Sequence, residues 1–218
     1  MKMDESDVKI GEAAAQAGEA TSTQPLTVRL HPEADAILAV QGEATSGVRK
    51  EFAISSAVLS VASDYFRTLL RSNFKEGIET RRGDCPTISM NEDDPQAMET
   101  ILSVLHYQNL GAHESLSIKT LAVIAMQSDK YDCTAALRPW FYLWFRDAGK
   151  VSDKDDLLYL LVGAYFINAP KHFADISARI VRNVTADFNS VWAKHDMTNL
   201  LPHYIRGAVS RKSQYRGR

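Results

Sequence analysis

Strand-like segments occupy the first third of this sequence, and segments with helical spacing follow them. Residues 25–30, 36–40 and 48–54 are short and rich in apolar or β-branched side chains, and a polar stretch with two glycines, residues 41–47, separates the last two. Cys85–Met90 is a fourth strand candidate. Strands followed mainly by helices predict an α+β fold, in which a small β-sheet is flanked by a cluster of α-helices.

The segment from Phe52 to Leu70, FAISSAVLSVASDYFRTLL, allows two interpretations. Serines beside an acidic residue could belong to a hydrolase, or the small residues could let two helices pack closely. The sequence shows no base and no oxyanion donor for a serine nucleophile. Ser55 or Ser56 can cap one short helix and Ser63 another, because a hydroxyl accepts from the free N–H groups of a first turn. We expect a helical hairpin with three apolar side chains in the core: Leu59, Phe66 and Leu69.

The next helix carries a clear start signal. Asp94 stands at the cap position, and Pro95 follows at the first helical position, where its missing N–H costs nothing. A stripe of apolar residues continues at helical spacing: Met98, Ile101, Leu102 and Leu105. A further helix is predicted over residues 116–130.

The second half of the chain contains an aromatic cluster and further helical patterns. Residues 140–145 contain five aromatics, which we interpret as core or junction packing, with a binding groove as the alternative. Ser152 with Asp155 resembles a capping box, which predicts a helix that ends before Pro170. Residues 173–184 then follow as an amphipathic helix.

These patterns divide the chain into four predicted parts. Residues 1–24 are acidic and residues 206–218 are basic, and both have little to bury. We therefore predict a disordered acidic N-terminal tail and a basic flexible C-terminal tail, which could alternatively bind a polyanion. Between them we predict one α+β domain over residues 25–135 and an all-α helical extension over residues 136–205.

Composition points to a soluble intracellular protein. The formal charge of −2 creates no field that would attract nucleic acid or a membrane. Cys85 and Cys133 are far apart, which favours a reducing compartment. The first residues lack the apolar core of a signal peptide, and the longest apolar run, Leu157–Ala169, is too short to span a bilayer. We expect the cytoplasm, the nucleus or both.

No pattern typical of an enzyme is present. None of the six histidines pairs with another His, Cys or carboxylate at a metal-binding spacing. The sequence lacks a GxSxG elbow, a GxxxxGK[ST] loop and a GxGxxG turn. The acid clusters at residues 92–94 and 153–156 both precede helices, whose dipole stabilises carboxylates there. We therefore predict a non-catalytic protein without cofactor or metal.

The span from about Leu26 to Tyr142 resembles a BTB/POZ domain, and most of all the variant abundant in filamentous fungi. The family features occur in order. The first is a strand that bears an Asp. The second is a Phe at the end of a strand, followed by a Leu, a Ser and an aromatic pair, and an apolar-x-Glu turn comes next. A strand with an acidic turn over residues 88–95 and an aspartate-lysine-tyrosine-aspartate segment complete the pattern. The matching residues are Asp35, Phe52, Leu59, Ser63, Tyr65, Phe66, Phe74, Lys75, Glu76, Asp129, Lys130 and Tyr131.

One pair of positions departs from that family. Many members have a His, often followed by Arg or Lys, where this chain has Ser55 and Ser56. In dimeric transcriptional members, the basic residue and the strand Asp help to line a charged pocket. This chain keeps Asp35 and lacks the basic partner. The resemblance therefore implies the fold without that co-repressor pocket, and it leaves open whether a swapped strand makes a homodimer.

The resemblance implies a protein–protein interaction module. Many such domains are substrate adaptors for cullin-RING ubiquitin ligases, in which the apolar side chain of the apolar-x-Glu turn inserts at the cullin interface. Phe74, Lys75 and Glu76 are the expected cullin contact, with a Phe74 folded onto the core as the alternative. The other function to consider is an oligomerising transcriptional or chromatin regulator. The lack of zinc-finger spacing and of a basic recognition helix speaks against nucleic acid as a partner.

Overall fold

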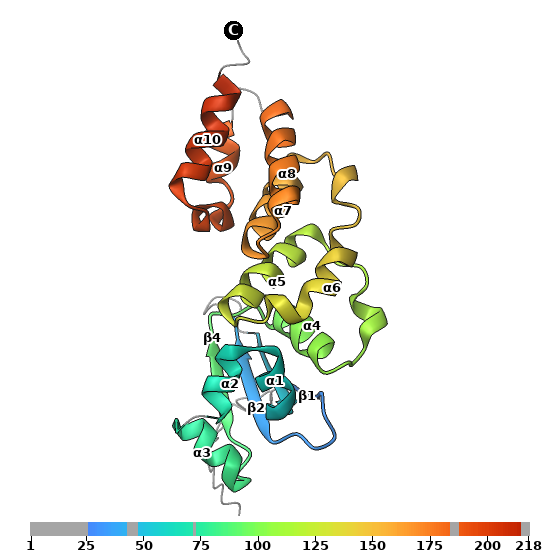
Figure 1. Cartoon of the computed structure of the whole chain (residues 1–218), viewed down its shortest axis with the longest axis vertical. Helices are drawn as coiled ribbons and strands as arrows, with labels where there is room; N and C mark the ends of the chain where they lie inside the picture. Colours follow the sequence, from blue (N-terminus) through green and yellow to red (C-terminus); the bar gives the residue numbers. More distant parts are fainter. Residues whose placement is uncertain (1–25, 43–47, 72, 184–187, 215–218) are drawn as a thin grey trace, which may run out of the picture.

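The computed structural model of the chain describes residues 26–42, 48–71, 73–183 and 188–214. The sheet and the first helices lie at one end of the molecule, and the C-terminal helices lie at the other (Figure 1). The predicted acidic segment 1–24 is outside the described residues. Among the described helices, none has both the length and the apolar character needed to cross a membrane.

The described strands form one mixed sheet in the order β1-β3-β2-β4. Strands β2 (Ala36–Gln41) and β3 (Arg49–Ile54) are antiparallel, with Leu38 opposite Phe52. Edge strand β1 (Leu26–Arg29) runs parallel to β3, and β4 (Thr87–Asn91) runs parallel to β2. The predicted strands are confirmed to within two residues at each end, but their order and direction were not predicted.

The predicted helical hairpin is confirmed as α1 (Ser56–Ala62) and α2 (Asp64–Arg71). The hydroxyl of Ser63 accepts the backbone N–H of Phe66 at 3.0 Å, as a cap does. The core prediction needs one correction. Leu59 and Phe66 are fully buried, but Leu69 is only partly buried, and Leu70 fills the core position instead. Helix α3 (Lys75–Arg82) follows and ends at Gly83, whose φ of 83° favours glycine.

Helix α4 (Pro95–Leu105) starts as predicted. Asp94 Oδ1 accepts the N–H groups of Gln96 and Ala97 at 3.0 and 2.8 Å. The apolar stripe of α4 is buried, including Met98 and Ile101. A short 3₁₀ helix, η1 (Leu110–His113), precedes two further helices, α5 (Ile118–Lys130) and α6 (Thr134–Trp144).

The aromatic segment of α6 serves mainly as packing. Phe141 and Phe145 are buried, and Trp140 and Trp144 pack partly buried against the core. Tyr142 differs, because 71% of its surface is exposed. Core or junction packing therefore explains most of residues 140–145.

The C-terminal elements are a 3₁₀ helix, η2 (Ala148–Lys150), then α7 (Lys154–Phe166), α8 (Pro170–Asn183), α9 (Phe188–Ala193), η3 (Asp196–Leu200) and α10 (His203–Gln214). Three predictions are corrected here. Asp153, not Ser152, caps α7, because its Oδ1 accepts the N–H groups of Asp155 and Asp156. Pro170 opens α8 as its first residue. The segment from Arg206 to Gln214 continues α10, where a flexible tail was expected.

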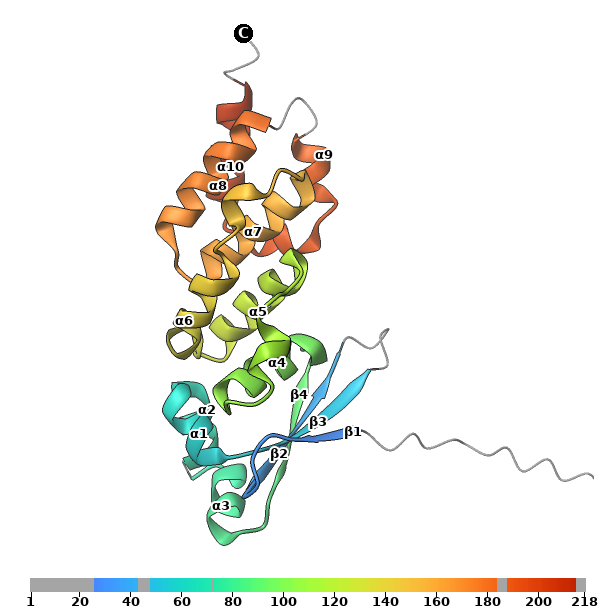
Figure 2. The same cartoon turned by 90° about the vertical axis from the view of Figure 1, so that its right-hand side faces the viewer.

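The hydrophobic core runs without interruption from the sheet into the C-terminal helices. Helix α7 lies on α5 (Figure 2). Gly163 of α7 comes close to α5, since a Cβ there would lie 3.7 Å from Ala122 Cα, and it would also meet Phe145, at the end of α6, at 3.2 Å. The predicted boundary between residues 135 and 136 is thus bridged by packing.

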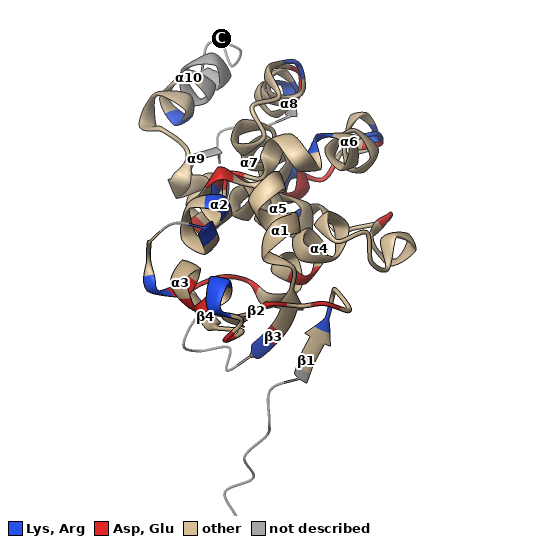
Figure 3. Ribbon diagram, turned by 60° about the horizontal axis from the view of Figure 1, so that its bottom comes forward, with Lys and Arg blue, Asp and Glu red and all other residues tan. Residues whose placement is uncertain are grey.

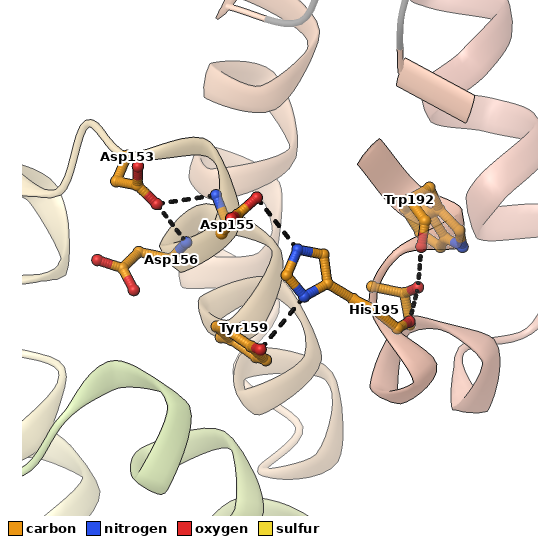
Figure 4. Close-up of polar contacts among 7 residues, drawn as sticks. Asp153, Asp155, Asp156, Tyr159, Trp192 and His195 are labelled. Carbon is orange, nitrogen blue, oxygen red and sulfur yellow. Dashed lines mark hydrogen bonds and ion pairs between the residues drawn. The ribbon is translucent and has the colours of Figure 1, made fainter. Parts of the chain in front are cut away.

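Polar contacts of His195 tie η3 to α7 (Figure 4). His195 Nε2 lies 3.1 Å from Asp155 Oδ1, and Nδ1 lies 3.2 Å from the Tyr159 hydroxyl. On the η3 side, the Thr198 hydroxyl is shared between the carbonyls of Trp192 and His195 at 2.8 and 2.6 Å. These contacts fix η3 along the side of α7.

Candidate functional site

Phe74 stands at the turn into α3, in an extended conformation with φ −66° and ψ 159°. Its side chain is 57% exposed, so it does not lie in the core. Lys75 is exposed, Glu76 is partly buried in the first helical turn, and Gly77 is buried under the turn. The structure therefore presents an aromatic side chain next to an acid on the outer surface.

Charges around this turn are mixed. Basic and acidic residues alternate over α2 and α3 (Figure 3). Arg67 pairs with Asp64 at 2.7 Å, and Lys75 Nζ lies 3.8 Å from Glu79 Oε1, on exposed surfaces where such pairs contribute little. The surface next to Phe74 consequently has no strong net charge of one sign, which suits an aromatic anchor better than a charged ligand.

Asp35 and Ser56 contact each other directly. Ser56 donates its backbone N–H to Oδ1 of Asp35 at 2.7 Å and its hydroxyl to Oδ2 at 2.6 Å. Ser56 is the first residue of α1, so Asp35 caps this helix from a position far away in sequence. Ser55, at the N-cap position, makes no side-chain cap hydrogen bond. The acid that the sequence analysis linked to a charged pocket therefore has an internal role here.

His106 completes the capping of α1 and was not singled out from the sequence. The ring is buried, and its Nε2 accepts the backbone N–H of Ser55 at 3.1 Å. Nδ1 therefore carries the proton and donates it to the carbonyl of Leu102 at 2.8 Å. Burial lowers the pKa of His106 below its ordinary 6.5, against an opposing effect of the Leu102 hydrogen bond. In the sequence, the only local indication of a structural role for His106 is its position directly after an apolar helix.

The aspartate-lysine-tyrosine segment meets the acidic turn after β4. Asp93 is 2% exposed, and its carboxylate accepts from Lys130 Nζ at 2.8 Å and from the hydroxyl of Tyr131. Burial raises the pKa of Tyr131, and the hydrogen bond to Asp93 raises it further. Asp129, the preceding match, is exposed and does not join this contact. The family pattern here builds a buried polar link.

The aromatic pair packs onto the same link. Phe66 stacks on Tyr131 with ring centroids 5.4 Å apart, and Tyr65 meets Tyr131 edge-on at 5.1 Å. The Ser63 hydroxyl donates to the Tyr131 carbonyl at 2.6 Å. Phe52, in β3, is buried in the core. Five of the family-pattern residues are thus brought together around Tyr131 and Asp93, namely Ser63, Tyr65, Phe66, Lys130 and Tyr131. Asp35 and Ser56 meet separately at α1, and Phe74 lies on the surface.

The described residues offer no clustered metal ligands. This part of the chain contains no group of three or more His, Cys, Asp or Glu side chains placed to hold a metal ion. Both cysteines are free, and burial raises the pKa of Cys133 to about 12, which keeps its thiol protonated.

Comparison with known proteins gives one result. A family model described as BTB/POZ domain matches residues 29–138, slightly more than half of the 218-residue chain. A search of curated proteins found no match. The matched span runs from the last residue of β1 into α6, so it contains strands β2, β3 and β4, the helical hairpin and the Phe74 turn.

Proposed function

Since the chain belongs to the BTB/POZ domain family, whose domains are protein–protein interaction modules, we propose that it acts as a substrate adaptor for a cullin-RING ubiquitin ligase in the cytoplasm or the nucleus. Phe74, Lys75 and Glu76 form the cullin contact in this proposal. Its resemblance to the fungal type of the family, with a helical extension, is part of the same proposal.

The exposure of Phe74 carries this proposal. A Phe side chain that is 57% exposed leaves a large apolar area in water, and covering it in a partner's pocket gains free energy. Aromatic anchors at the centre of an interface often contribute at least about 2 kcal/mol to binding. Glu76 lies two residues after Phe74 and supplies a charged neighbour that can fix the orientation of the partner.

The helices after α6 support the same role. Helix α7 packs against α5, and its buried Leu157 and Leu161 belong to the hydrophobic core that the two helices share. In an adaptor, a second element of this kind would lengthen the cullin contact or hold a client.

A pull-down from cell extract, read by mass spectrometry, tests this proposal. The wild-type chain is expected to recover a cullin, and Phe74→Ala and Glu76→Ala are expected to lose it. Tyr204→Ala is the matched control, because Tyr204 is 70% exposed and belongs to α10, a helix at the other end of the molecule (Figure 1). If no cullin is recovered, or if all variants recover it equally, the adaptor role is wrong.

A second function, an oligomerising transcriptional or chromatin regulator, is favoured by one observation. Val61 on α1 is 87% exposed and Tyr65 on α2 is 42% exposed, so the hairpin offers an apolar surface for self-association. Light scattering distinguishes monomer from dimer. Binding of DNA that falls steeply with salt and disappears in Arg211→Gln/Lys212→Gln would support the regulator instead.

A further inference from the structure

A groove of about 710 Å³ lies between the end of the sheet, α5 and η3. Its apolar wall comes from three elements and consists of Val123, Met126, Phe166, Met197 and Leu200. Leu200 is 52% exposed, which is high for a leucine that faces other apolar side chains. None of the described lining residues belongs to α3, so the groove is separate from the Phe74 turn.

Gln127 supplies a polar atom without a partner at this groove. The residue lines the groove and is only 6% exposed, yet its Oε1 has no hydrogen-bond partner among the described residues. A buried acceptor left unpaired lowers stability, and a donor brought by a ligand would remove that cost. The groove therefore favours an occupant that combines apolar surface with N–H donors.

The rim of the groove is acidic. Its acids are Glu92, Asp93, Asp94 and Asp129, and its bases are Lys50 and Lys130. Both bases are already used, because Lys130 pairs with Asp93 at 2.8 Å and Lys50 pairs with Glu99 at 2.6 Å.

Two of the rim acids keep an uncompensated charge. Glu92 and Asp129 are exposed and have no ion pair with a described residue. Burial and the nearby carboxylate of Asp132 raise the pKa of Asp129, so a cation placed beside it would be stabilised. The occupant of the groove should therefore be basic.

We propose that this groove binds the basic segment 209–218 from the C-terminus of a second copy of the chain. The segment reads VSRKSQYRGR, with four cations, no acid and one aromatic residue. Its cations pair with Glu92 and Asp129, an apolar side chain such as Tyr215 packs on the groove wall, and a backbone or side-chain donor satisfies Gln127. Charge complementarity selects this segment, because it is the most basic stretch of the sequence.

The segment reaches a neighbour more readily than its own groove. Helix α10 starts next to η3 and runs toward the far end of the molecule (Figure 1). Its twelve residues rise about 18 Å. Residues 209–214 belong to this helix and therefore lie away from the end of β4, which Glu92 follows, so the groove of a second copy is the site for the segment. Docking between copies is therefore heterologous and produces chains or closed rings.

The groove is formed before any segment binds. Its η3 wall, with Met197 and Leu200, is held on α7 by the contacts of His195 with Asp155 and Tyr159 (Figure 4). A wall fixed in this way does not need to be ordered on binding, which lowers the entropic cost of association.

A labelled synthetic peptide, residues 209–218, provides the test when titrated with the full chain and followed by fluorescence anisotropy. We expect saturable binding that weakens with salt. Glu92→Lys/Asp129→Lys is expected to reduce the affinity about tenfold. Gln127→Met, which keeps the size and removes the acceptor, should reduce it about fivefold without unfolding the protein. In parallel, sedimentation of the full chain should show larger species that disappear when the four cations are changed to Gln.

Matched controls separate this site from general charge attraction. Glu33→Lys/Glu114→Lys adds the same charge at exposed positions away from the groove and should leave peptide affinity within about twofold. A peptide of the same composition in scrambled order should bind more weakly. The proposal is overturned if the peptide does not bind, or if both pairs of variants weaken it equally. Phe74 lies outside the groove, so the groove variants should recover a cullin as the wild type does, whether or not they bind the peptide.

Discussion

The first turns of α1 and α3 are built in different ways. At α1, the N–H groups of Ser55 and Ser56 are taken by His106 and Asp35, two side chains that come from distant parts of the sequence. At α3, the turn exposes Phe74 and leaves charged residues in water. The first arrangement uses polar residues to hold the fold together, and the second leaves an aromatic side chain on the surface. Matching a family pattern therefore does not by itself mark a residue as functional.

The largest expected contrast is between two phenylalanines. Phe66 is fully buried against Tyr131, so Phe66→Ala should lower the free energy of unfolding by about 3–5 kcal/mol. Phe74→Ala removes a side chain that is 57% exposed and should cost less than about 1 kcal/mol. Urea unfolding of both variants checks this prediction. A similar cost for the two would mean that Phe74 belongs to the core.

The buried link at Asp93 should give the next largest effect. Asp93→Ala leaves the Tyr131 hydroxyl buried without its acceptor, while Lys130 can turn to water because its side chain is 49% exposed. We expect a loss of about 2–3 kcal/mol in the free energy of unfolding. Asp129→Ala is the control, since Asp129 is exposed and should change stability by less than about 0.5 kcal/mol. Thermal unfolding checks this prediction, and an equal loss of stability in the two variants would contradict the buried link.

A double-mutant cycle measures the contact between Asp35 and Ser56. Asp35→Ala removes two hydrogen bonds at the start of α1 and should cost about 2 kcal/mol. Ser56→Ala removes only the hydroxyl bond and should cost about 1 kcal/mol. The double variant should cost at least about 0.5 kcal/mol less than the sum, because the two residues share one bond. Additive losses would show that the hydroxyl contact is not formed in solution.

The smallest effect is a pH dependence from His106. Its pKa is lowered in the folded chain, so the unfolded chain binds a proton that the folded chain does not. The neutral ring contributes its full stabilisation above pH 6.5, and this is lost progressively as the pH falls from 6.5 toward the lowered value. His106→Gln cannot titrate. The difference in unfolding free energy between wild type and variant should shrink from pH 7.5 to 5, and a constant difference would contradict the assignment.

Local signals in the sequence predicted the elements well. Asp94 and Pro95 mark the start of α4 because a cap and the helix that it caps are neighbours in the chain. The same reasoning placed the cap of α7 one residue early, because Ser152 and Asp153 both have side chains that can cap. The continuation of α10 to Gln214 was missed, since charge alone does not distinguish a solvated helix from a tail.

Contacts between distant residues could not be predicted in the same way. Asp35 and Ser56 are 21 positions apart, and Ser55 and His106 are 51 apart, so only the folded sheet and helices bring them together. The sequence likewise did not determine whether Phe74 is exposed, because an apolar residue before a helix can face either the core or the solvent. The apolar wall of the groove beside Gln127 comes from three elements that are far apart in the sequence, so no local pattern predicts it.

Binding of a purified cullin N-terminal domain, measured by isothermal titration calorimetry against the wild-type chain and Phe74→Ala, tests the central claim most directly. We expect the wild type to bind and Phe74→Ala to bind at least about 30-fold more weakly, which corresponds to a hot-spot residue, while its unfolding free energy changes by less than about 1 kcal/mol. Equal affinity of the two proteins, or no binding by the wild type, would contradict the role of the Phe74 turn.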